Sequence, residues 1–414
     1  MGAPDEGPRD RERARRYRVV GGGVALTLSA TLAFGCPPAA APDAAHAPDG
    51  GRDASASPPL PPPPSAVAGG GPSPPPSPVA SFALGHGRGC AVRVDGRVVC
   101  WGASPLLGDL RRSPPEEAQF VKVLDDVLSV SGDDDRWCAL RRGGGVACFA
   151  DLGPARVLAG ASEVVELSGR CARRASGAVE CIDDSGALLP AEGVAAARGI
   201  GGGPSSSCAI GLDGGLACWG ANGFGELGDD TGKDSASAVP VKGVTRVDEV
   251  SVGRGLVCAR AGFEVTCWGG EGSVGKPAGR PRKKAGLGRV TQLAVGEYHA
   301  CVLRADATIA CWGSNLSGQL GAPLDLHTEG DFDSTAKPVP GVGEVEEVRV
   351  GGGEPCSGCG STCVRRRGRP HELLCWGAMA GEVGVRKTVS LLPRPAPTRS
   401  PAAVDPLRAA DRHR

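Results

Sequence analysis

Short runs in which apolar and polar residues alternate recur along the middle of the chain. The clearest runs are residues 244–252, 290–295 and 342–350, and each ends near a glycine. Alternation with a period of two is typical of strands that bury one face. This region has no long stretch with the 3.6-residue periodicity of an amphipathic helix. The pattern therefore predicts an all-β fold made of many short strands.

Cysteines mark a repeat in the same region. Of the 17 cysteines, fourteen form seven pairs, and the first members span 273 residues in six steps, a mean period of 45.5 residues. The pairs are Cys90 with Cys100, Cys138 with Cys148, Cys171 with Cys181, Cys208 with Cys218, Cys258 with Cys267, Cys301 with Cys311, and Cys363 with Cys375. A period of this length is typical of propellers and solenoids.

The spacing within each pair predicts a β-hairpin. Five pairs are separated by ten residues, so their cysteines face each other across a three-residue loop, whose last position favours glycine. Four of the five loops have it, at Gly96, Gly144, Gly177 and Gly214. Ala307 is the exception, while the other two pairs require the loops 262–263 and 367–371. Facing Cα atoms lie about 4.5–5.5 Å apart, so we expect one cross-strand disulfide per repeat.

Further motifs follow the second cysteine. Trp-Gly occurs in five repeats, at Trp101, Trp219, Trp268, Trp312 and Trp376. A G-x-[LV]-G turn follows in four of them, at residues 225–228, 272–275, 318–321 and 381–384. Residues 293–303, with Cys311-Trp312-Gly313 and the turn 318–321, resemble one repeat of the RCC1 type, and residues 208–228 and 258–275 are similar. The resemblance covers residues 79–393.

The resemblance implies a seven-bladed β-propeller, with one four-stranded blade for each cysteine pair. It also implies that His299 is a structural hydrogen-bonding residue and that the Trp-Gly tryptophans pack between blades. The repeats at Cys138 and Cys171 lack Trp-Gly and the turn. The regularity of these two blades therefore remains open at this stage.

The N-terminus has the composition of an export signal. Residues 1–18 hold six arginines, residues 19–35 are uncharged, and Cys36 follows. Residues 32–36 resemble a bacterial lipobox, with Ala33 and Phe34 where leucine and a small residue are usual. Ala33 and Gly35 would also suit an ordinary signal peptidase, which would give a soluble secreted protein. Because Cys36 is the odd cysteine, we favour a lipid anchor on its thiol and a location at the bacterial periplasm or cell surface.

This organisation divides the chain into four parts: a signal peptide (1–36), a disordered Pro/Ala/Gly-rich linker (37–78), the propeller (79–393) and a disordered tail (394–414). In an exported protein, cysteines form disulfides. Cys356 and Cys359 lie close to Cys363 and Cys375, and four thiolates could hold zinc. A Cys356–Cys359 disulfide, or a local exchange with Cys363, fits the compartment better.

Charge adds little. The 46 basic and 46 acidic residues balance, so composition does not call for nucleic acid. The basic runs 280–284 and 365–367 have no interleaved aromatics, and we expect exposed loops there. We predict a monomer that meets the membrane only through its N-terminal lipid and does not bind nucleic acid.

Other constellations are weak. Residues 270–276 nearly form a phosphate-binding loop, but Pro277 stands where Ser or Thr must reach magnesium. The carboxylates at residues 133–135 and at Asp325, Glu329, Asp331 and Asp333 lack EF-hand spacing. We predict no catalytic residue, no metal site and no cofactor.

The function that fits best is a non-catalytic scaffold at the cell envelope, binding an unidentified protein partner through its loops. The longest insert, residues 321–340, is the best candidate for the contact region. Three alternatives remain. They are guanine-nucleotide exchange, as in the family's eponymous member, inhibition of a secreted enzyme, and a hydrolase or lyase in the propeller channel.

Overall fold

The computed structural model describes residues 79–102, 119–120, 124–132, 136–150, 154–270, 279–321, 332–352, 360–378 and 386–390. These ranges consist of strands and the turns between them. They contain no helix long and apolar enough to cross a membrane.

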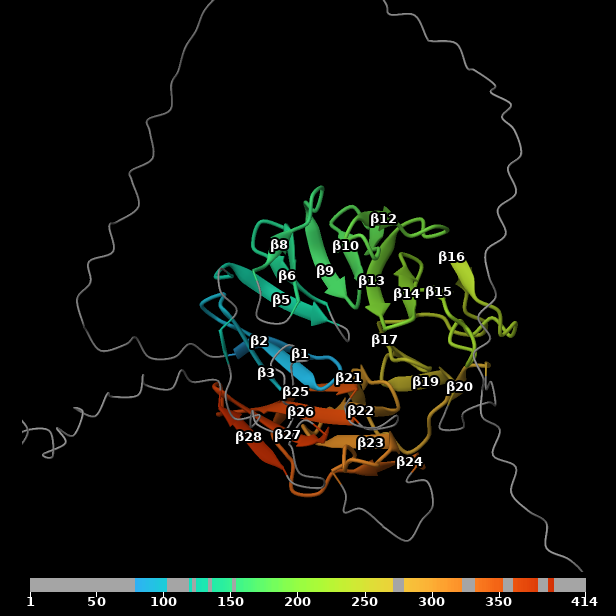
Figure 1. Cartoon of the computed structure of the whole chain (residues 1–414). Coiled ribbons are helices and arrows are strands. Elements are labelled where there is room, and N and C mark those ends of the chain that lie inside the picture. The colour runs from blue at the N-terminus through green and yellow to red at the C-terminus, as the bar shows by residue number, and fades with distance from the viewer. Residues whose placement is uncertain are drawn as a thin grey trace, which may run out of the picture. The chain divides into compact units, whose positions relative to one another are not determined.

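The strands form seven antiparallel sheets of four, each built from consecutive strands (Figure 1). Blades 1 to 3 contain β1 (Val79–Leu84), β2 (Arg88–Arg93), β3 (Val98–Gly102), β4 (Gln119–Phe120); β5 (Val127–Gly132), β6 (Trp137–Arg141), β7 (Val146–Phe149), β8 (Arg156–Val157); and β9 (Val164–Ser168), β10 (Cys171–Arg174), β11 (Val179–Ile182), β12 (Leu188–Pro190). Blade 4 contains β13 (Ala197–Gly202), β14 (Ser206–Gly211), β15 (Leu216–Gly220), β16 (Ser235–Pro240). Blades 5 to 7 contain β17 (Glu249–Val252), β18 (Leu256–Ala261), β19 (Glu264–Gly269), β20 (Arg282–Lys283); β21 (Val290–Val295), β22 (His299–Arg304), β23 (Ile309–Ser314), β24 (Phe332–Pro338); and β25 (Val345–Gly352), β26 (Gly360–Arg366), β27 (Glu372–Gly377), β28 (Lys387–Ser390).

The seven sheets close into a ring. The first strand of each blade contacts the first strand of the next, and β25 contacts β1. Figure 1 shows these first strands around a common centre, with the fourth strands on the outside. The fold is thus a seven-bladed β-propeller, as the repeat predicts. The repeats at Cys138 and Cys171 form four-stranded blades like the others.

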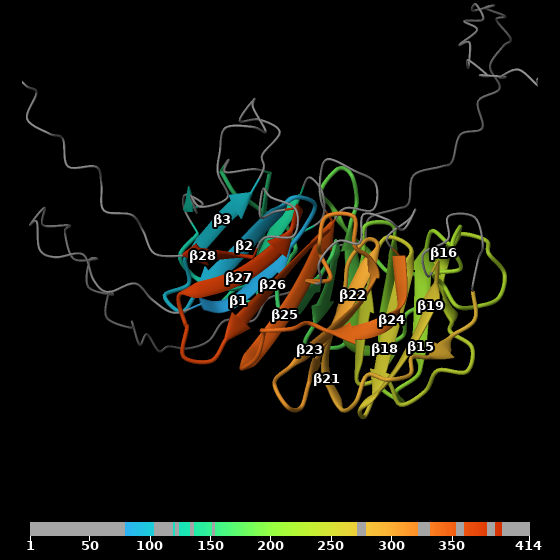
Figure 2. The same ribbon diagram turned by 90° about the horizontal axis from the view of Figure 1, so that it is seen from below.

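Blades 1 and 7 close the ring without exchanging a strand (Figure 2). Their backbones are joined by two hydrogen bonds, from Val79 N to the Pro370 carbonyl (2.8 Å) and from Gly87 N to the Gly352 carbonyl (3.0 Å). The Arg349 guanidinium also donates from Nε to the Phe82 carbonyl (3.2 Å). Closure therefore depends on these contacts and on the apolar core between β1–β3 and β26–β28.

The disulfides agree with the spacing of the cysteines. Each pair lies directly opposite between the second and third strands of its blade, with Cα atoms 4.0–4.1 Å apart in every pair. The bonds join Cys90 to Cys100, Cys138 to Cys148, Cys171 to Cys181, Cys208 to Cys218, Cys258 to Cys267, Cys301 to Cys311, and Cys363 to Cys375. Each blade therefore has one cross-strand disulfide. The Cα atoms lie slightly closer together than the range expected for facing residues.

The hairpin loops also close as expected. The last residue of each three-residue loop has positive φ, including Ala307 at 63°. Gly262 also has positive φ, at 60°, while Phe263 does not, as a type II′ turn requires. The local geometry of the hairpins therefore follows from loop length and from the residues at the tips.

The cores lie between neighbouring blades, as predicted for the tryptophans. Trp268 of blade 5 packs on apolar residues of blade 4, and Trp376 of blade 7 packs on blade 6. Blade 2 has Phe149 at the Trp-Gly position, and Phe149 and Trp137, its partner on β6, are both buried in the core shared with blade 1. Two aromatic side chains on paired strands therefore fill this core without the Trp-Gly motif.

Candidate functional site

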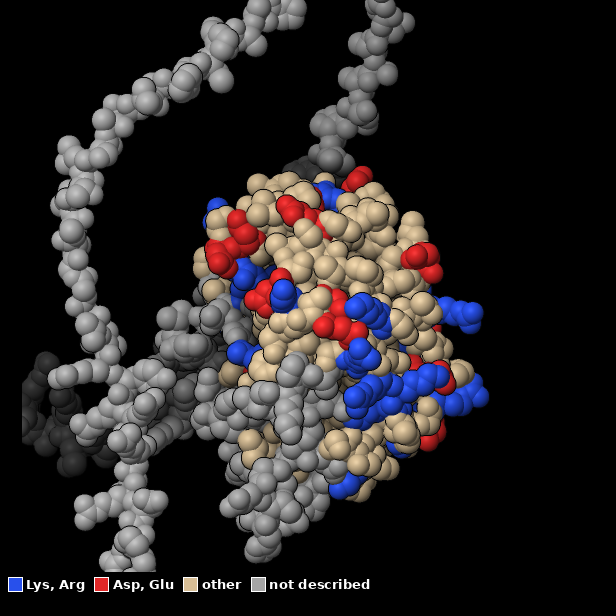
Figure 3. Space-filling model, turned by 90° about the vertical axis from the view of Figure 1, so that its right-hand side faces the viewer, with Lys and Arg blue, Asp and Glu red and all other residues tan. Residues whose placement is uncertain are grey.

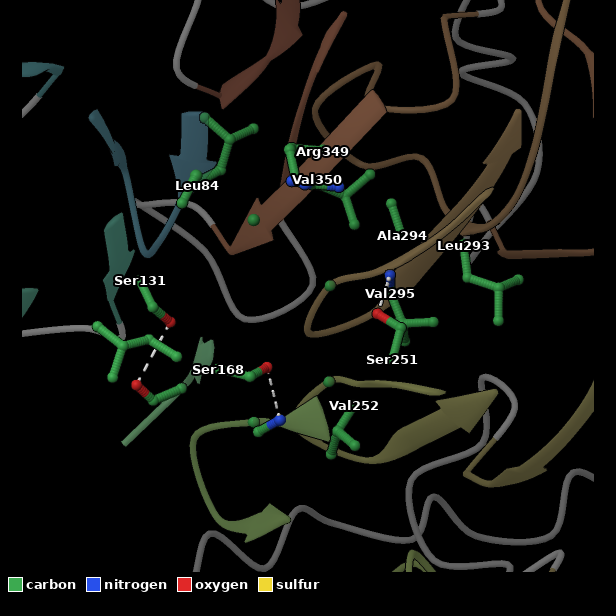
Figure 4. A pocket seen from close by; sticks show the side chains of 18 of the residues that line it. Leu84, Ser131, Ser168, Ser251, Val252, Leu293, Ala294, Val295, Arg349 and Val350 are labelled. Atoms are coloured by element: carbon green, nitrogen blue, oxygen red, sulfur yellow. Dashed lines mark hydrogen bonds between the residues drawn. The ribbon is translucent and has the colours of Figure 1, made fainter. Parts of the chain in front are cut away.

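The first strands of the blades line a central channel, whose cavity measures about 470 Å³ (Figure 4). Because each blade is an antiparallel meander, its β2–β3-type hairpin and the start of its first strand emerge on the same side of the ring. We call this side the hairpin face. The opposite side, where first strands end and third strands lead into fourth strands, is the loop face.

The channel mouth on the hairpin face is ringed by bulges. In six blades the pairing of the first and second strands skips one residue near the start of the first strand. The skipped residues are Ala80, Leu128, Val165, Arg198, Thr291 and Glu346, and all are exposed. A bulge turns its extra side chain away from the ladder. The skipped side chains are apolar in blades 1 to 3 and polar in blades 4, 6 and 7, and of the six Arg198 lines the channel.

In three blades a side chain near the start of the first strand joins neighbouring blades. In blades 3 and 6 this residue directly follows the bulge. Glu166 Oε1 accepts from Ile200 N (3.3 Å), Glu249 Oε1 from Leu293 N (3.1 Å), and Gln292 Oε1 from Val348 N (3.0 Å). The first strand of a blade is an edge strand, and its outward N–H groups would otherwise lack a partner. These side chains therefore act as clamps between consecutive blades.

Each clamping glutamate is oriented by an arginine directly across its sheet. Arg173 Nε lies 2.7 Å from Glu166 Oε2, and Arg260 Nε lies 2.9 Å from Glu249 Oε2. One carboxylate oxygen thus holds the arginine while the other holds the next blade. These pairs were not predicted from the sequence. The available signal was an arginine two residues after the first cysteine of the pair, at Arg173 and Arg260.

Two serine hydroxyls in the channel also join neighbouring blades. Ser168 Oγ accepts from Gly202 N (2.9 Å), and Ser251 Oγ accepts from Val295 N (3.0 Å), as Figure 4 shows. Both serines are therefore committed to backbone hydrogen bonds. Among the described channel-lining residues the one histidine is His86, which pairs with Glu297 rather than with either serine.

Charged residues from three blades meet where the channel opens on the loop face. His86 Nδ1 of blade 1 lies 3.0 Å from Glu297 Oε1, and Arg254 Nε of blade 5 lies 3.2 Å from Glu297 Oε2. Glu297, from blade 6, is 8% exposed and sits against Gly352 of blade 7. The cluster therefore spans the junction at which the ring closes.

His299 is fully buried between blades 6 and 7. Its Nε2 lies 3.0 Å from Thr362 Oγ1, which itself donates to the Gln319 carbonyl (2.8 Å). Thr362 must therefore accept, which assigns the proton to His299 Nε2. Burial lowers the pKa of His299 to about 3, and Nδ1 has no hydrogen-bond partner among the described residues. The side chain is a neutral structural donor, in the role that the resemblance implies.

The turns after the third strands are held by the same hydrogen bonds in two blades. Asn222 Oδ1 accepts from Leu227 N and Asn315 Oδ1 accepts from Leu320 N, both at 2.9 Å. The next blade's tryptophan then donates to the turn, from Trp268 Nε1 to the Glu226 carbonyl (2.7 Å) in one case. Trp376 Nε1 donates to the Gln319 carbonyl (2.9 Å) in the other. The loop face therefore rests on a rigid base.

Comparison with known families matches one stretch of this framework. Residues 290–319, which comprise β21, β22, β23 and the Asn315 turn, match the Regulator of chromosome condensation (RCC1) repeat. This stretch is therefore similar to an RCC1 repeat. A comparison with curated proteins finds no match.

Solved structures resemble the propeller in part. Prp20p from Saccharomyces cerevisiae is 14% identical, with a TM-score of 0.47 over 76% of each chain. Human WBSCR16 is 18% identical, with a TM-score of 0.44 over 77% of this chain and 83% of that one. PorZ, a bacterial surface component of the type-IX secretion system of Porphyromonas gingivalis, is 11% identical, with a TM-score of 0.47 over 77% of this chain and 38% of PorZ.

The basic runs of the propeller lie partly in strands. Arg282 and Lys283 form strand β20, and Arg365 and Arg366 end β26, so the expectation of loops at these runs is wrong in part. The cause is that their backbones pair with β19 and with β25 and β27. The described residues contain no group of three or more His, Cys, Asp or Glu able to hold a metal ion.

Several predicted features lie outside the described residues. They are Cys36 with the signal, linker and tail, Cys356, Cys359, the carboxylates at 133–135, 325, 329 and 331, the turns 272–275 and 381–384, and most of the near phosphate-binding stretch. Of the 321–340 insert, residues 322–331 also lie outside.

Proposed function

We propose that this RCC1-repeat propeller is an exported scaffold, anchored to the bacterial envelope through Cys36, that binds a partner protein through its loop face. The observation that carries the proposal is that the channel side chains and the loop face have different roles. Polar side chains in the channel are engaged in joining blades, whereas the loop face offers long connections on a rigid base. Variable loops on a rigid framework are the usual place of function in repeat proteins.

Export is supported by the sulfur chemistry. Seven disulfides lie inside the blades, and such bonds persist in oxidising compartments. The basic and apolar N-terminus followed by Cys36 supplies the route and the anchor. Peptide mapping of the exported protein without reductant should recover the seven bridged pairs together with an acylated Cys36. Free thiols in the mature protein would contradict the export proposal.

The loop-face site is centred on blade 6. β23 ends at Ser314 and leads into the turn that Asn315 holds, and β24 begins at Phe332. Leu316, within this turn, is 46% exposed although it lies next to buried Asn315 and Ser317. An exposed apolar side chain on a backbone that is already held in place can be covered by a partner at a low cost in conformational entropy. We therefore assign the partner contact to Leu316 and the 321–340 insert.

Site-specific crosslinking tests this assignment. The full exported chain is expressed with a photoreactive residue at Leu316 or at Leu212, which is exposed on the opposite hairpin face. We expect a discrete covalent adduct from position 316 and none from position 212. Adducts of equal yield at both positions, or at neither, would refute binding through the loop face.

The same experiment separates the alternative functions. Exchange activity predicts that the adduct contains a small GTPase, and inhibition predicts that it contains a secreted enzyme. Prp20p binds Gsp1p and histones, and these partners are not assigned to the present chain. An envelope scaffold predicts a partner that is itself exported. Identifying the adduct by mass spectrometry distinguishes these outcomes.

A further inference from the structure

A row of cations lies on the outer rim of blade 5 and continues to the end of blade 4. Lys242, Arg280, Arg282, Lys283 and Lys284 make up this row, which we call the basic edge. The first four are exposed and Lys284 is half-buried. Figure 3 shows Lys and Arg side chains gathered on this side of the propeller. The basic edge is therefore a surface feature of the rim, separate from the channel, and it reaches the loop face at Arg280, in the β19–β20 connection.

The acidic residues that pair with the basic edge do not neutralise it. Asp230 lies 3.2 Å from Arg280 Nε and 3.7 Å from Lys242 Nζ, and Glu264 lies 2.7 Å from Lys283 Nζ. Among the described residues, the four exposed cations face these two carboxylates, which leaves an excess of positive charge on the basic edge. Such exposed ion pairs are weak and can exchange for another anion.

Arg282 has no acidic partner among the described residues, and Lys284 is held in a different way. Its Nζ lies over the ring of Trp312, 5.2 Å from the centroid, and Trp312 is fully buried. The aromatic ring fixes the position of this cation without reducing its charge. The basic edge therefore keeps its positive charges close together on a framework that does not need to rearrange.

Protection of an exposed sheet edge is the simplest explanation for lysine and arginine on an outer strand. The composition of the other outer strands indicates that edge protection does not explain all of these cations. β12 and β16 end in proline, β8 has one cation beside an exposed valine, and β28 starts with one lysine. If one cation or a proline is enough for these edges, four cations within residues 280–284 exceed what blade 5 needs.

The chemistry of the basic edge favours a flat, anionic partner. Protein interfaces are centred on buried aromatic or apolar anchors. Trp312, the aromatic ring that contacts the basic edge, is fully buried beneath Lys284 and cannot act as such an anchor. A cluster of charges without an apolar centre suits the headgroup region of an anionic bilayer, where each Lys or Arg adds to the attraction.

We infer that the basic edge of blade 5 binds the anionic phospholipid surface of the membrane to which the chain is tethered. This inference rests on the export and anchoring in the proposed function, and it adds a second membrane contact to the lipid at Cys36. In the sequence, 42 residues (37–78) separate Cys36 from the propeller. Contact through the basic edge of blade 5 leaves the loop face of blade 6, around Leu316, free for its partner.

Vesicle binding by the full chain tests the inference. Cys36→Ser removes the acyl anchor, so that binding reports the propeller surface alone. We expect this protein to bind phosphatidylcholine vesicles that contain phosphatidylglycerol, and not vesicles of phosphatidylcholine alone. Added Arg282→Gln and Lys283→Gln should weaken binding about 25-fold, since each charge contributes roughly fivefold. High salt should abolish binding because it screens exposed charges.

A matched control removes two cations elsewhere. Arg97→Gln with Arg156→Gln takes the same charge from exposed positions on blades 1 and 2 and should leave vesicle affinity almost unchanged. Equal losses in both variants would mean that net charge, not the basic edge, governs binding. Unchanged vesicle affinity with self-association of the Arg282/Lys283 variant would support edge protection and overturn the inference. Crosslinking at Leu316 is measured separately, so failure here is distinct from failure of the proposed function.

Discussion

Blades 4 and 6 are two copies of the same repeat that have the same backbone features and different side chains at several positions. Both have the same strand order, a three-residue hairpin loop, a facing disulfide and an asparagine-held turn. Four of the equivalent positions at which they differ are informative, namely Ser206 and His299, Gly201 and Ala294, Glu226 and Gln319, and Gly214 and Ala307. The surroundings of each position account for the residue found there. The comparison shows that the two blades share one backbone conformation, whereas their side chains differ with the contacts that each blade makes.

The largest difference is the histidine. His299 meets Thr362 on blade 7, whereas Ser206 has no hydrogen-bond partner for its hydroxyl among the described residues, and Val257 stands at the position of Thr362 on blade 5. The folded protein binds a proton at His299 only near pH 3, while the unfolded chain binds it near pH 6.5. As pH falls through this window, the unfolded state therefore gains protons first and folding stability is lost.

We predict that His299→Ser, which copies blade 4, reduces this acid sensitivity. The wild-type protein should lose roughly 5 kcal/mol more than the variant between pH 6.5 and pH 3, because burial lowers the pKa of His299 from 6.5 to about 3. At pH 7 the variant should be less stable by about 2–4 kcal/mol because a buried side chain is truncated. Denaturant unfolding without reductant, repeated across this pH range, measures both effects. Parallel pH profiles for the two proteins would contradict the buried neutral assignment.

The second difference concerns how closely blades approach. A Cβ on Gly201 would lie 2.9 Å from the Val250 carbonyl oxygen and 3.0 Å from Val250 Cγ1, so blades 4 and 5 meet directly there. At the equivalent position Ala294 is accommodated in the core. We predict that Gly201→Ala costs about 1–3 kcal/mol, because one blade must shift against the other. Denaturant unfolding of the oxidised protein measures this loss.

The neighbouring Gly199 provides the control for this variant. A Cβ there would meet the end of the Ile210 side chain at 3.3 Å, which can move. Gly199→Ala should therefore change the free energy of unfolding by less than about 0.5 kcal/mol. If both substitutions had the same effect, strand propensity rather than blade contact would explain it.

The parts of the fold that sequence could predict depend on short-range chemistry. A loop of three residues, a glycine at its end and two cysteines ten apart define a hairpin without reference to any other repeat. The same reasoning succeeds at Ala307, where the geometry of the loop overrides the residue and imposes positive φ. Repetition of the unit then predicts the ring.

The channel could not be predicted in the same way, because its partners come from different repeats. Glu249 binds Arg260 in its own blade but also Leu293, 44 residues later. The His86–Glu297 contact spans 211 residues and exists only once the ring has closed. Nothing in the local spacing of either residue encodes this distance. Cross-strand partners within a blade are visible in sequence, and partners between blades are not.

The third difference compares a carboxyl with an amide. Glu226 and Gln319 occupy the same buried turn position, and burial raises the pKa of the Glu226 carboxyl. Its charged form therefore disfavours the folded state as pH rises above the range in which the unfolded chain ionises. Glu226→Gln should stabilise the protein at pH 8 by about 1 kcal/mol or less, and the gain should vanish near pH 4. Denaturant unfolding at these two pH values measures the gain, and a gain that does not change with pH would assign the effect to packing rather than to charge.

The smallest difference lies in the hairpin loops. Ala307 holds φ of 63°, where a Cβ is strained, whereas Gly214 holds φ of 79° at the same position in blade 4. We predict that Ala307→Gly raises the free energy of unfolding by about 0.5 kcal/mol, because relief of strain exceeds the extra entropy of glycine in the unfolded chain. The reciprocal Gly214→Ala should lower it by about 1 kcal/mol or more, since its Cβ would also lie 3.1 Å from Arg246 Cα. Thermal unfolding of both variants in the oxidised protein measures the pair. Shifts of the same sign would mean that the two hairpins do not share one backbone requirement.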